Sequence, residues 1–202
     1  MKVLCVSLGR NATQSFAEFV KDQGFKTTHF YNIQTVKLGE FSENAEGILD
    51  HFKSLPYSDA HVDMPTCLVF DSLYEMFPDA KYINITRPAE DWVASMIKMK
   101  NHYIDRMGIS RDPFPFEEAY CNMYIKTGKN KIQDLDEDEL YAIRQKHLDK
   151  VKDFFKDKDN YLEVELSDPE IGKKIKEFIG GTEDIPFPNN DGFRRKNFSQ
   201  PF

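Results

Sequence analysis

The sequence predicts an α/β fold, in which a mainly parallel β-sheet is covered by α-helices on both faces in three layers. The first observation is that a short apolar strand followed by an amphipathic helix recurs three times along the chain. Such alternation is typical of parallel sheets, and right-handed crossovers bring the carboxyl ends of the strands to one edge. The second is that 40% of the 202 residues are hydrophobic, enough for a core of one domain. We expect that single domain to span residues 1–202, with a helical insertion over residues 108–157.

The first predicted unit is a strand, a tight turn and a helix N-terminus within KVLCVSLGRNATQ, residues 2–14. The apolar run over residues 3–6 predicts a buried strand, and a helix is expected from about Thr13. The first N–H groups of a helix have no partner within it, and its dipole adds partial positive charge. Arg10 adds a planar cation that suits phosphate or sulfate oxygens. The turn therefore indicates an anion site, although an ordinary turn with a solvated arginine fits the same residues.

The remaining elements follow from periodicity and from residues that stop a helix. The expected strands, rich in β-branched or aromatic residues, also include residues 25–31, 80–86 and 161–166. The expected helices carry apolar residues three or four positions apart and cover residues 13–24, 45–55, 65–77, 88–107, 116–127, 135–156 and 169–179. Gly24, Pro56 and Gly180 end three of these helices. Residues 57–64 read as a polar connector.

The strand AKYINIT, residues 80–86, is followed directly by Arg87 and then by a long helix. The carboxyl ends of parallel strands form the edge at which ligands bind in open α/β sheets. Arg87 is therefore expected at the same edge as Arg10. Ser95 lies eight positions beyond Arg87, so the helix can present it to the same ligand. Two cations near a helix N-terminus predict a multiply charged anion as ligand.

Composition excludes several classes of function. The net charge of −7 disfavours nucleic acid as a partner, so an anion site must be a local basic pocket. The three cysteines, Cys5, Cys67 and Cys121, have no metal-type spacing, and the acidic run DLDEDE reads as a solvated helix start, so we expect no metal site. No apolar run approaches the roughly 18 residues of a membrane span, and no signal peptide opens the chain. We expect a soluble, cytoplasmic protein.

Two segments of the chain resemble signatures of the sulfotransferase family. The segment VSLGRNATQSF resembles its 5′-phosphosulfate loop. The segment FPDAKYINITRPAEDWVASM is similar to its second signature, in which a strand ends in Arg and a Ser lies eight positions further on. The segments EVELSDPEIGKKIKEFIGG and IPFPNNDGF also resemble the closing strand, helix and tail of the family. Together the similarity covers about half of the chain and implies a P-loop-like α/β fold.

The resemblance implies transfer of a sulfuryl group from 3′-phosphoadenosine 5′-phosphosulfate to a hydroxyl or amine of a small-molecule or carbohydrate acceptor, without a metal. Arg10 would neutralise the charge of the transferring group. The residues that would cradle the 5′-phosphosulfate are Gly9, Arg10, Asn11, Ala12, Thr13, Gln14 and Ser15. The residues that would hold the 3′-phosphate are Arg87 and Ser95, with Arg194 and Arg195 of the basic tail either a flap over it or a solvated end.

The acceptor side requires a base, and several residues qualify. Asp63 matches an acidic position of related sequences, but a helix cap for the segment from Pro65 explains it equally well. His102 and His61 are the other candidates, and each also fits an ordinary hydrogen-bonded side chain. Ala12 replaces the usual second glycine of the loop, and its Cβ is expected to disfavour a positive φ. The helical region from 108 to 156 is expected to shape the acceptor pocket.

Two other functions stay open on the sequence. A small-molecule kinase with a degenerate loop would need Mg²⁺ and the Lys-[ST] pair that this loop lacks. A binding protein that kept the nucleotide pocket but lost turnover would explain Ala12.

Overall fold

The computed structural model describes residues 2–29, 58–107, 121, 123–125, 128–129 and 131–188. The chain divides into two compact units. The first, called the sheet unit here, comprises Met1–Asn32, Pro56–Thr86 and Asp159–Phe202. The second, called the helical unit, comprises Ile33–Leu55 and Arg87–Lys158. The predicted helix over residues 45–55 lies outside the described residues, and the one over 116–127 lies mostly outside them.

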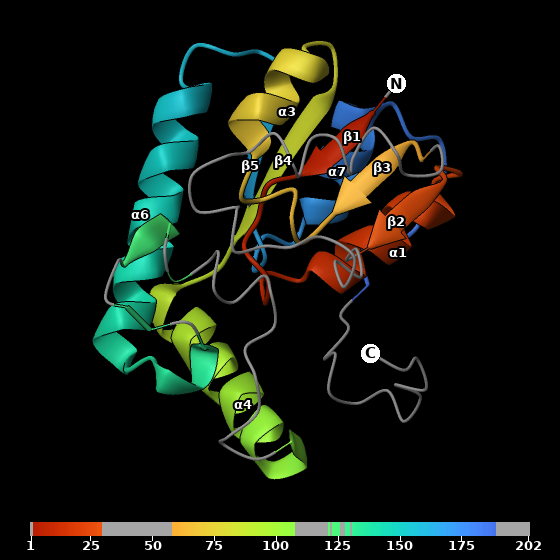
Figure 1. Ribbon diagram of the computed structural model, residues 1–202. Coiled ribbons are helices and arrows are strands. Elements are labelled where there is room, and N and C mark those ends of the chain that lie inside the picture. Colours follow the sequence, from red (N-terminus) through yellow and green to blue (C-terminus); the bar gives the residue numbers. More distant parts are fainter. Residues whose placement is uncertain are drawn as a thin grey trace. The chain divides into compact units, whose positions relative to one another are not determined.

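The sheet unit is built on five parallel strands in the order β2-β3-β1-β4-β5 (Figure 1). Their bounds are β1 Val3–Cys5, β2 Thr27–His29, β3 Ala60–Val62, β4 Lys81–Thr86 and β5 Tyr161–Glu165. In the register, Leu4 of β1 lies opposite His61 on one side and Tyr82 on the other. The predicted parallel sheet is therefore confirmed, and the strands end at one edge.

Strand β3 corrects the sequence prediction, because it lies within the expected polar connector. Ala60, His61 and Val62 are all buried, because β3 pairs with β1 on one side and with β2 on the other. A three-residue strand is too short to show a period-2 pattern, and its central histidine adds to the polar appearance. The pairing with β1 places Asp63, the next residue, beside the β1–α1 turn.

Helices cover both faces of the sheet. Helices α1, Thr13–Asp22, and α7, Ile171–Ile179, pack on one face. This apolar cluster comprises Val3, Cys5, Phe16, Ala17, Phe19, Val20, Ala60, Val62, Ile83, Ile85, Val164, Ile171, Ile175 and Ile179. Helix α3, Phe70–Met76, lies on the other face, where the ring of Tyr74 is 5.4 Å from that of Tyr82. The three-layer arrangement is thus confirmed.

Two of these helices begin later than predicted. Residues 64–68 form turns, with Thr66 N–H donating to the Asp63 carbonyl and Leu68 N–H to the Pro65 carbonyl. Helix α3 therefore starts at Phe70, although a helix was expected from Pro65. Helix α7 starts at Ile171 because the carboxylate of Asp168 accepts the Glu170 N–H in a turn. Such side-chain bonds to the backbone compete with helix formation.

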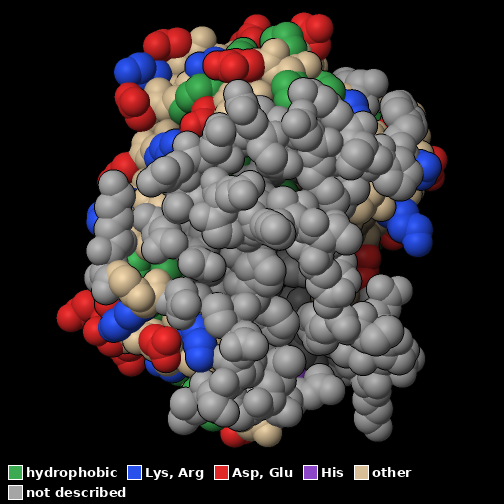
Figure 2. Space-filling view, in the orientation of Figure 1, with side chains coloured by type: hydrophobic (Ala, Val, Ile, Leu, Met, Phe, Trp, Pro, Cys, Tyr) green, Lys and Arg blue, Asp and Glu red, His purple; other side chains and the backbone are tan. Residues whose placement is uncertain are grey.

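The helical unit contains α4, Ala89–Met107, the 3₁₀ turn η2, Ile132–Asp134, and α6, Glu137–Phe155. As predicted, α4 follows Arg87-Pro88, and its Trp92 is fully buried. The acidic run caps α6: Asp136 accepts the Glu139 N–H, and Glu139 accepts the Asp136 N–H. Figure 2 shows acidic and basic side chains interspersed over α6, as expected of a solvated helix face. Among the described residues, no helix is both long and apolar enough to span a bilayer.

The segment after α7 is tied to α1. The side-chain amide of Gln23 donates to the Glu183 carbonyl at 2.9 Å and accepts the Glu183 N–H at 3.0 Å. The ring of Phe187 lies 5.5 Å from that of Phe19. A Cβ at Gly172 would lie 3.2 Å from the Phe187 nitrogen, so the glycine permits this close approach. The segment over residues 182–188 therefore belongs to the packed part of the sheet unit.

Candidate active site

The turn between β1 and α1 has an unusual backbone. Arg10 has φ 71° and Ala12 has φ 56°, both in the left-handed region. For a residue with a Cβ this region costs roughly 1–2 kcal/mol. The expectation that Ala12 would avoid a positive φ is therefore wrong: the turn keeps the conformation of a glycine-containing loop. Alternating left- and right-handed residues at a helix N-terminus are a common way to build a concave anion site.

The side chains of this turn are mostly inside the protein. Asn11, Thr13 and Ser15 are 4%, 5% and 1% exposed, respectively, while Arg10 and Gln14 are half-buried. The side-chain oxygen of Asn11 is buried and has no hydrogen-bond partner in the part of the chain that the structure describes. A buried polar atom without a hydrogen-bond partner costs stability, so the stability of the fold alone does not explain the conformation of the turn.

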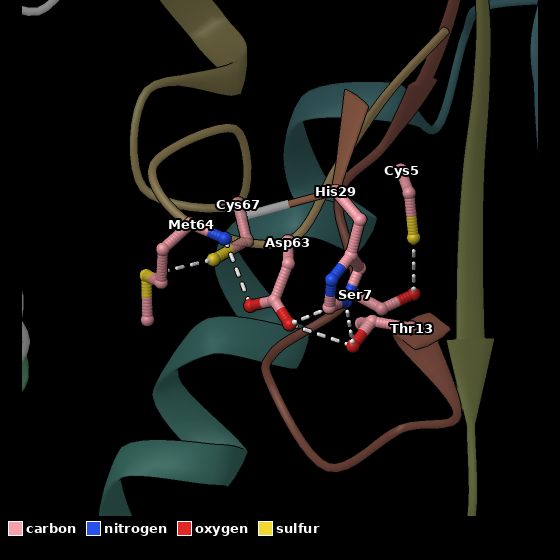
Figure 3. A network of polar contacts seen from close by, with 7 residues as sticks. All are labelled: Cys5, Ser7, Thr13, His29, Asp63, Met64 and Cys67. Atoms are coloured by element: carbon pink, nitrogen blue, oxygen red, sulfur yellow. Dashed lines mark hydrogen bonds and ion pairs between the residues drawn. The ribbon is translucent and has the colours of Figure 1, made fainter. Parts of the chain in front are cut away.

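Asp63 is the centre of a polar cluster at this turn (Figure 3). The Thr13 hydroxyl donates to Asp63 Oδ2 at 2.6 Å. His29 Nε2 lies 3.3 Å from the same oxygen and 3.3 Å from Thr13 Oγ1. The Met64 N–H donates to Asp63 Oδ1 at 2.8 Å. The cluster joins the start of α1, the end of β2 and the residue after β3, and we call these three side chains the Thr13–His29–Asp63 cluster.

The carboxyl group of Asp63 is held ionised. Its burial by itself raises the pKa, but the hydrogen bond and electrostatic interaction with the His29 ring, together with the hydrogen bonds from Thr13 and from the Met64 N–H, outweigh burial. The net pKa lies below the usual value of 3.8. The helix-cap alternative for Asp63 is wrong, because α3 begins seven residues later, at Phe70, and the carboxylate binds Thr13 and His29 instead.

The thiols near the cluster are neutral. Burial raises the pKa of Cys5 to about 11, and it also raises the pKa of Cys67 well above the usual 9.0. The Cys5 thiol donates to Ser7 Oγ, which accepts the Ile85 N–H at 2.6 Å. Ser7 thereby fixes the end of β1 to β4.

The other predicted site residues lie in the helical unit. Arg87 directly follows β4 in the chain and is half-buried, and its carbonyl accepts a hydrogen bond of 2.5 Å from Arg144 Nη2 of α6. Ser95 and His102 lie on α4 and are half-buried. Within the sheet unit, the structure brings Thr13 of the predicted 5′-phosphosulfate loop into contact with Asp63. Arg194 and Arg195 lie outside the described residues.

His61, one of the candidate bases, is too deeply buried to contact an acceptor. It lies within β3 and is 2% exposed, and burial together with the positive charge of Lys2 lowers its pKa to about 4. Among the described residues, no cluster of three or more His, Cys, Asp or Glu side chains is suited to a metal ion.

His29 and Arg144 were not among the residues predicted from the sequence. His29 ends β2, and position at the carboxyl end of a strand is the one signal that would have singled it out. Arg144 lies among many charged residues of α6, so its sequence looks like a solvated face. Its contact with Arg87 depends on the packing of α6 near α4, which no local pattern indicates.

Comparisons with known proteins identify the family and the fold of this chain. A family model described as "Sulfotransferase domain" matches residues 2–197. A curated relative, "Ava biosynthesis cluster protein M" of Aspergillus versicolor, is 31% identical over 108 residues. The match covers 48% of this chain and 42% of that relative, so it spans less than half of either protein.

Two solved structures share the fold. The mouse sulfotransferase SULT7A1 complexed with PAP has a TM-score of 0.50 at 17% identity, with 95% of this chain and 60% of that chain covered. A sulfotransferase from Alicyclobacillus acidocaldarius has a TM-score of 0.54 at 12% identity, with 93% and 84% covered. At these identities the likeness establishes the P-loop-like α/β fold.

Proposed function

This chain belongs to the sulfotransferase domain family, and from that premise we propose that it transfers a sulfuryl group from 3′-phosphoadenosine 5′-phosphosulfate to a small-molecule or carbohydrate acceptor. The acceptor group would be a hydroxyl or an amine. The observation that carries the proposal is the β1–α1 turn, in which left-handed Arg10 and Ala12 precede the N-terminus of α1. The mouse relative is complexed with PAP, and we propose the same class of nucleotide for this chain.

The proposed nucleotide contacts come from three segments. The 5′-phosphosulfate would lie on residues 9–15, from Gly9 to Ser15, where α1 presents N–H groups that have no partner within the helix. The 3′-phosphate would be held by Arg87 and Ser95. Strands β1 and β4 are neighbours and end at one edge of the sheet, and Arg87 directly follows β4. We propose that the basic tail, with Arg194 and Arg195, adds to the 3′-phosphate site.

Sulfuryl transfer requires groups that stabilise the negative charge of the transferring group, and a base that removes the proton of the acceptor. As the bond from sulfur to the bridging oxygen breaks, negative charge grows on that oxygen and on the sulfuryl oxygens. Arg10 and the N–H groups of the turn would stabilise this charge, and one such donor is typically worth about 3–4 kcal/mol. A fixed guanidinium supplies positive charge there without a metal. On the acceptor side, Asp63 lies next to the turn, and His102 of α4 is a second candidate base.

The rival functions have less support. A P-loop kinase needs a Lys-[ST] pair for phosphate and Mg²⁺, and the turn of this chain has Ala12-Thr13 at its helix start. The argument for an inactive binding protein was the Cβ of Ala12, yet this residue adopts the left-handed backbone. None of the three cysteines forms a disulfide, which fits a reducing compartment, and we propose that the reaction takes place in the cytoplasm.

Thermal unfolding with nucleotides tests the function. Adenosine 3′,5′-bisphosphate at 100 times its dissociation constant should add about 2.7 kcal/mol of stability, in the presence of EDTA. For a domain of this size the Tm should rise by roughly 5–10 °C. Adenosine 5′-monophosphate, which lacks the 3′-phosphate, is the matched control and should have a much smaller effect. Stabilisation by ATP with Mg²⁺ and none by the bisphosphate would establish the kinase instead.

A further inference from the structure

His29 occupies a position that the proposed contacts do not use. It is the last residue of β2, the outermost strand next to β3, and it lies at the carboxyl edge of the sheet. Its side chain is 33% exposed, whereas that of Asp63 is 13% exposed. Of the Thr13–His29–Asp63 cluster, His29 is thus the member with most access to a second substrate.

The contacts fix the tautomer of His29. Its Nε2 lies 3.3 Å from Asp63 Oδ2, and an ionised carboxylate only accepts hydrogen bonds. Nε2 also lies 3.3 Å from Thr13 Oγ1, whose single hydrogen is already donated to Asp63. Both neighbours of Nε2 therefore require a hydrogen on it. A neutral imidazole with its hydrogen on Nε2 keeps a lone pair on Nδ1. The cluster thus holds His29 with a basic nitrogen directed away from Asp63.

Asp63 itself is poorly placed to take a proton. Oδ2 accepts from Thr13 and faces His29, and Oδ1 accepts from the Met64 N–H, so both oxygens are already engaged in hydrogen bonds that stabilise the ionised form. Its lowered pKa also makes it a weak base. Two further titratable groups near it are the thiols of Cys5 and Cys67, which their raised pKa values keep neutral.

From this geometry we propose that His29 is the general base that removes the acceptor's proton, with Asp63 as its positioning residue. The inference rests on the proposed sulfuryl transfer. The acceptor's O–H or N–H gives its proton to His29 Nδ1, and the freed lone pair forms the new bond to sulfur. The bond from sulfur to the bridging oxygen breaks, and its electrons leave with adenosine 3′,5′-bisphosphate. Asp63 stabilises the imidazolium, as a carboxylate does in a Ser-His-Asp triad, until the proton passes to water.

The first test needs no acceptor. Nitrogen-15 NMR of the full chain distinguishes a protonated from an unprotonated imidazole nitrogen. We expect His29 to show a protonated Nε2 and an unprotonated Nδ1 in the neutral form. Substitution of Asp63→Asn should mix the two tautomers, because the amide can also donate to Nε2. A neutral His29 with its hydrogen on Nδ1 would overturn the inference.

The second test compares two phenols as sulfuryl acceptors. His29→Gln keeps an N–H near the position of Nε2 but has no base, so the contact with Asp63 is retained. With 2-naphthol, whose hydroxyl must lose a proton, kcat should fall about 10²- to 10⁴-fold. With 4-nitrophenol at mildly alkaline pH, whose hydroxyl is already largely ionised, the loss should be under about tenfold. A general structural defect would lower both rates equally, and imidazole in the buffer should partly restore His29→Ala.

Binding of adenosine 3′,5′-bisphosphate separates this inference from the proposed function. His29→Gln should bind the bisphosphate as the wild type does. If the wild type does not bind it, the proposed function fails and the role of His29 fails with it. If the wild type binds it and transfers sulfuryl, but His29→Gln sulfates 2-naphthol at the wild-type rate, the function stands and the inference is wrong. Loss of transfer in Asp63→Asn without a loss in His29→Gln would likewise overturn the inference, because Asp63 would then act without His29.

Discussion

The hydroxyl of Thr13 donates a hydrogen bond of 2.6 Å to Asp63 Oδ2. The first residue of α1 is thereby attached to the residue that follows β3. Since the strained turn immediately precedes Thr13, this bond holds the turn against the sheet. The same bond helps to keep the pKa of Asp63 below its usual value.

Removal of this hydroxyl should destabilise the protein. Thr13→Val keeps the shape of the side chain but leaves a buried carboxylate with one donor fewer, at a cost of about 1–3 kcal/mol. Thr13→Ser, which keeps the hydroxyl, is the matched control and should lose less. Urea unfolding at neutral pH measures both variants. Equal stabilities of the valine and serine variants would show that the hydrogen bond contributes nothing.

His61 should make stability depend on pH. Burial lowers its pKa from the usual 6.5 to about 4. Below pH 6.5 His61 binds a proton in the unfolded chain, whereas in the folded protein it does so only below about pH 4. The free energy of unfolding therefore falls as the pH decreases through this window, by at most about 1.4 kcal/mol per pH unit from this group.

The variant His61→Gln isolates that contribution. Glutamine does not titrate, so the wild type should lose more stability than the variant as the pH falls from 6.5 to 4. Urea unfolding at several pH values gives the two curves, and the difference between them is the readout. Parallel curves would mean that His61 is protonated equally in both states.

Ala12→Gly should stabilise the protein. Ala12 has φ 56°, a conformation that glycine adopts without the clash of a Cβ. The relief is partly offset by the greater freedom of glycine in the unfolded chain, so we expect a net gain of about 0.5–1 kcal/mol. The Tm should rise by roughly 1–4 °C in calorimetry. A lower Tm would contradict the left-handed assignment, and Ala12→Val is the opposite control because a β-branched residue tolerates this region least.

Two arginines should differ in their effect on nucleotide binding. Arg87→Ala removes a proposed contact with the 3′-phosphate and should weaken binding of adenosine 3′,5′-bisphosphate about 10- to 150-fold, by calorimetry. Arg144→Met removes a hydrogen bond to the Arg87 carbonyl and should weaken it about fivefold, through the position of Arg87. Lys156→Met is the control, since this exposed cation pairs with Asp153. Unchanged affinity in Arg87→Ala would remove that residue from the site.

The sequence predicted the architecture well where a signal is local. Strands β4 and β5 and helices α1, α4 and α6 lie within one or two residues of their expected bounds, because each combines a periodic apolar face with a clear stop. Strand β3 was missed, since three residues with a central histidine are too short to show a strand pattern, and their burial depends on pairing with strands on both sides. The parallel direction of the strands, though not their order, followed from alternation with helices alone.

The site was predicted in part. Thr13 and Asp63, 50 positions apart, were both named from the family resemblance, and the structure brings them into contact. Nothing local connects either with His29, because their meeting depends on β3 lying between β1 and β2. The left-handed backbone at Ala12 also escaped prediction, since the strain is compensated by bonds made elsewhere in the fold.

The side-chain amide of Gln23 makes two hydrogen bonds to the backbone of Glu183, as a neighbouring strand would. The ring of Phe187 packs against that of Phe19. A truncation at Gly181 would therefore expose an aromatic ring of the core and leave an amide unpaired. A chain shortened to end before Phe187 should therefore be less stable than the full chain.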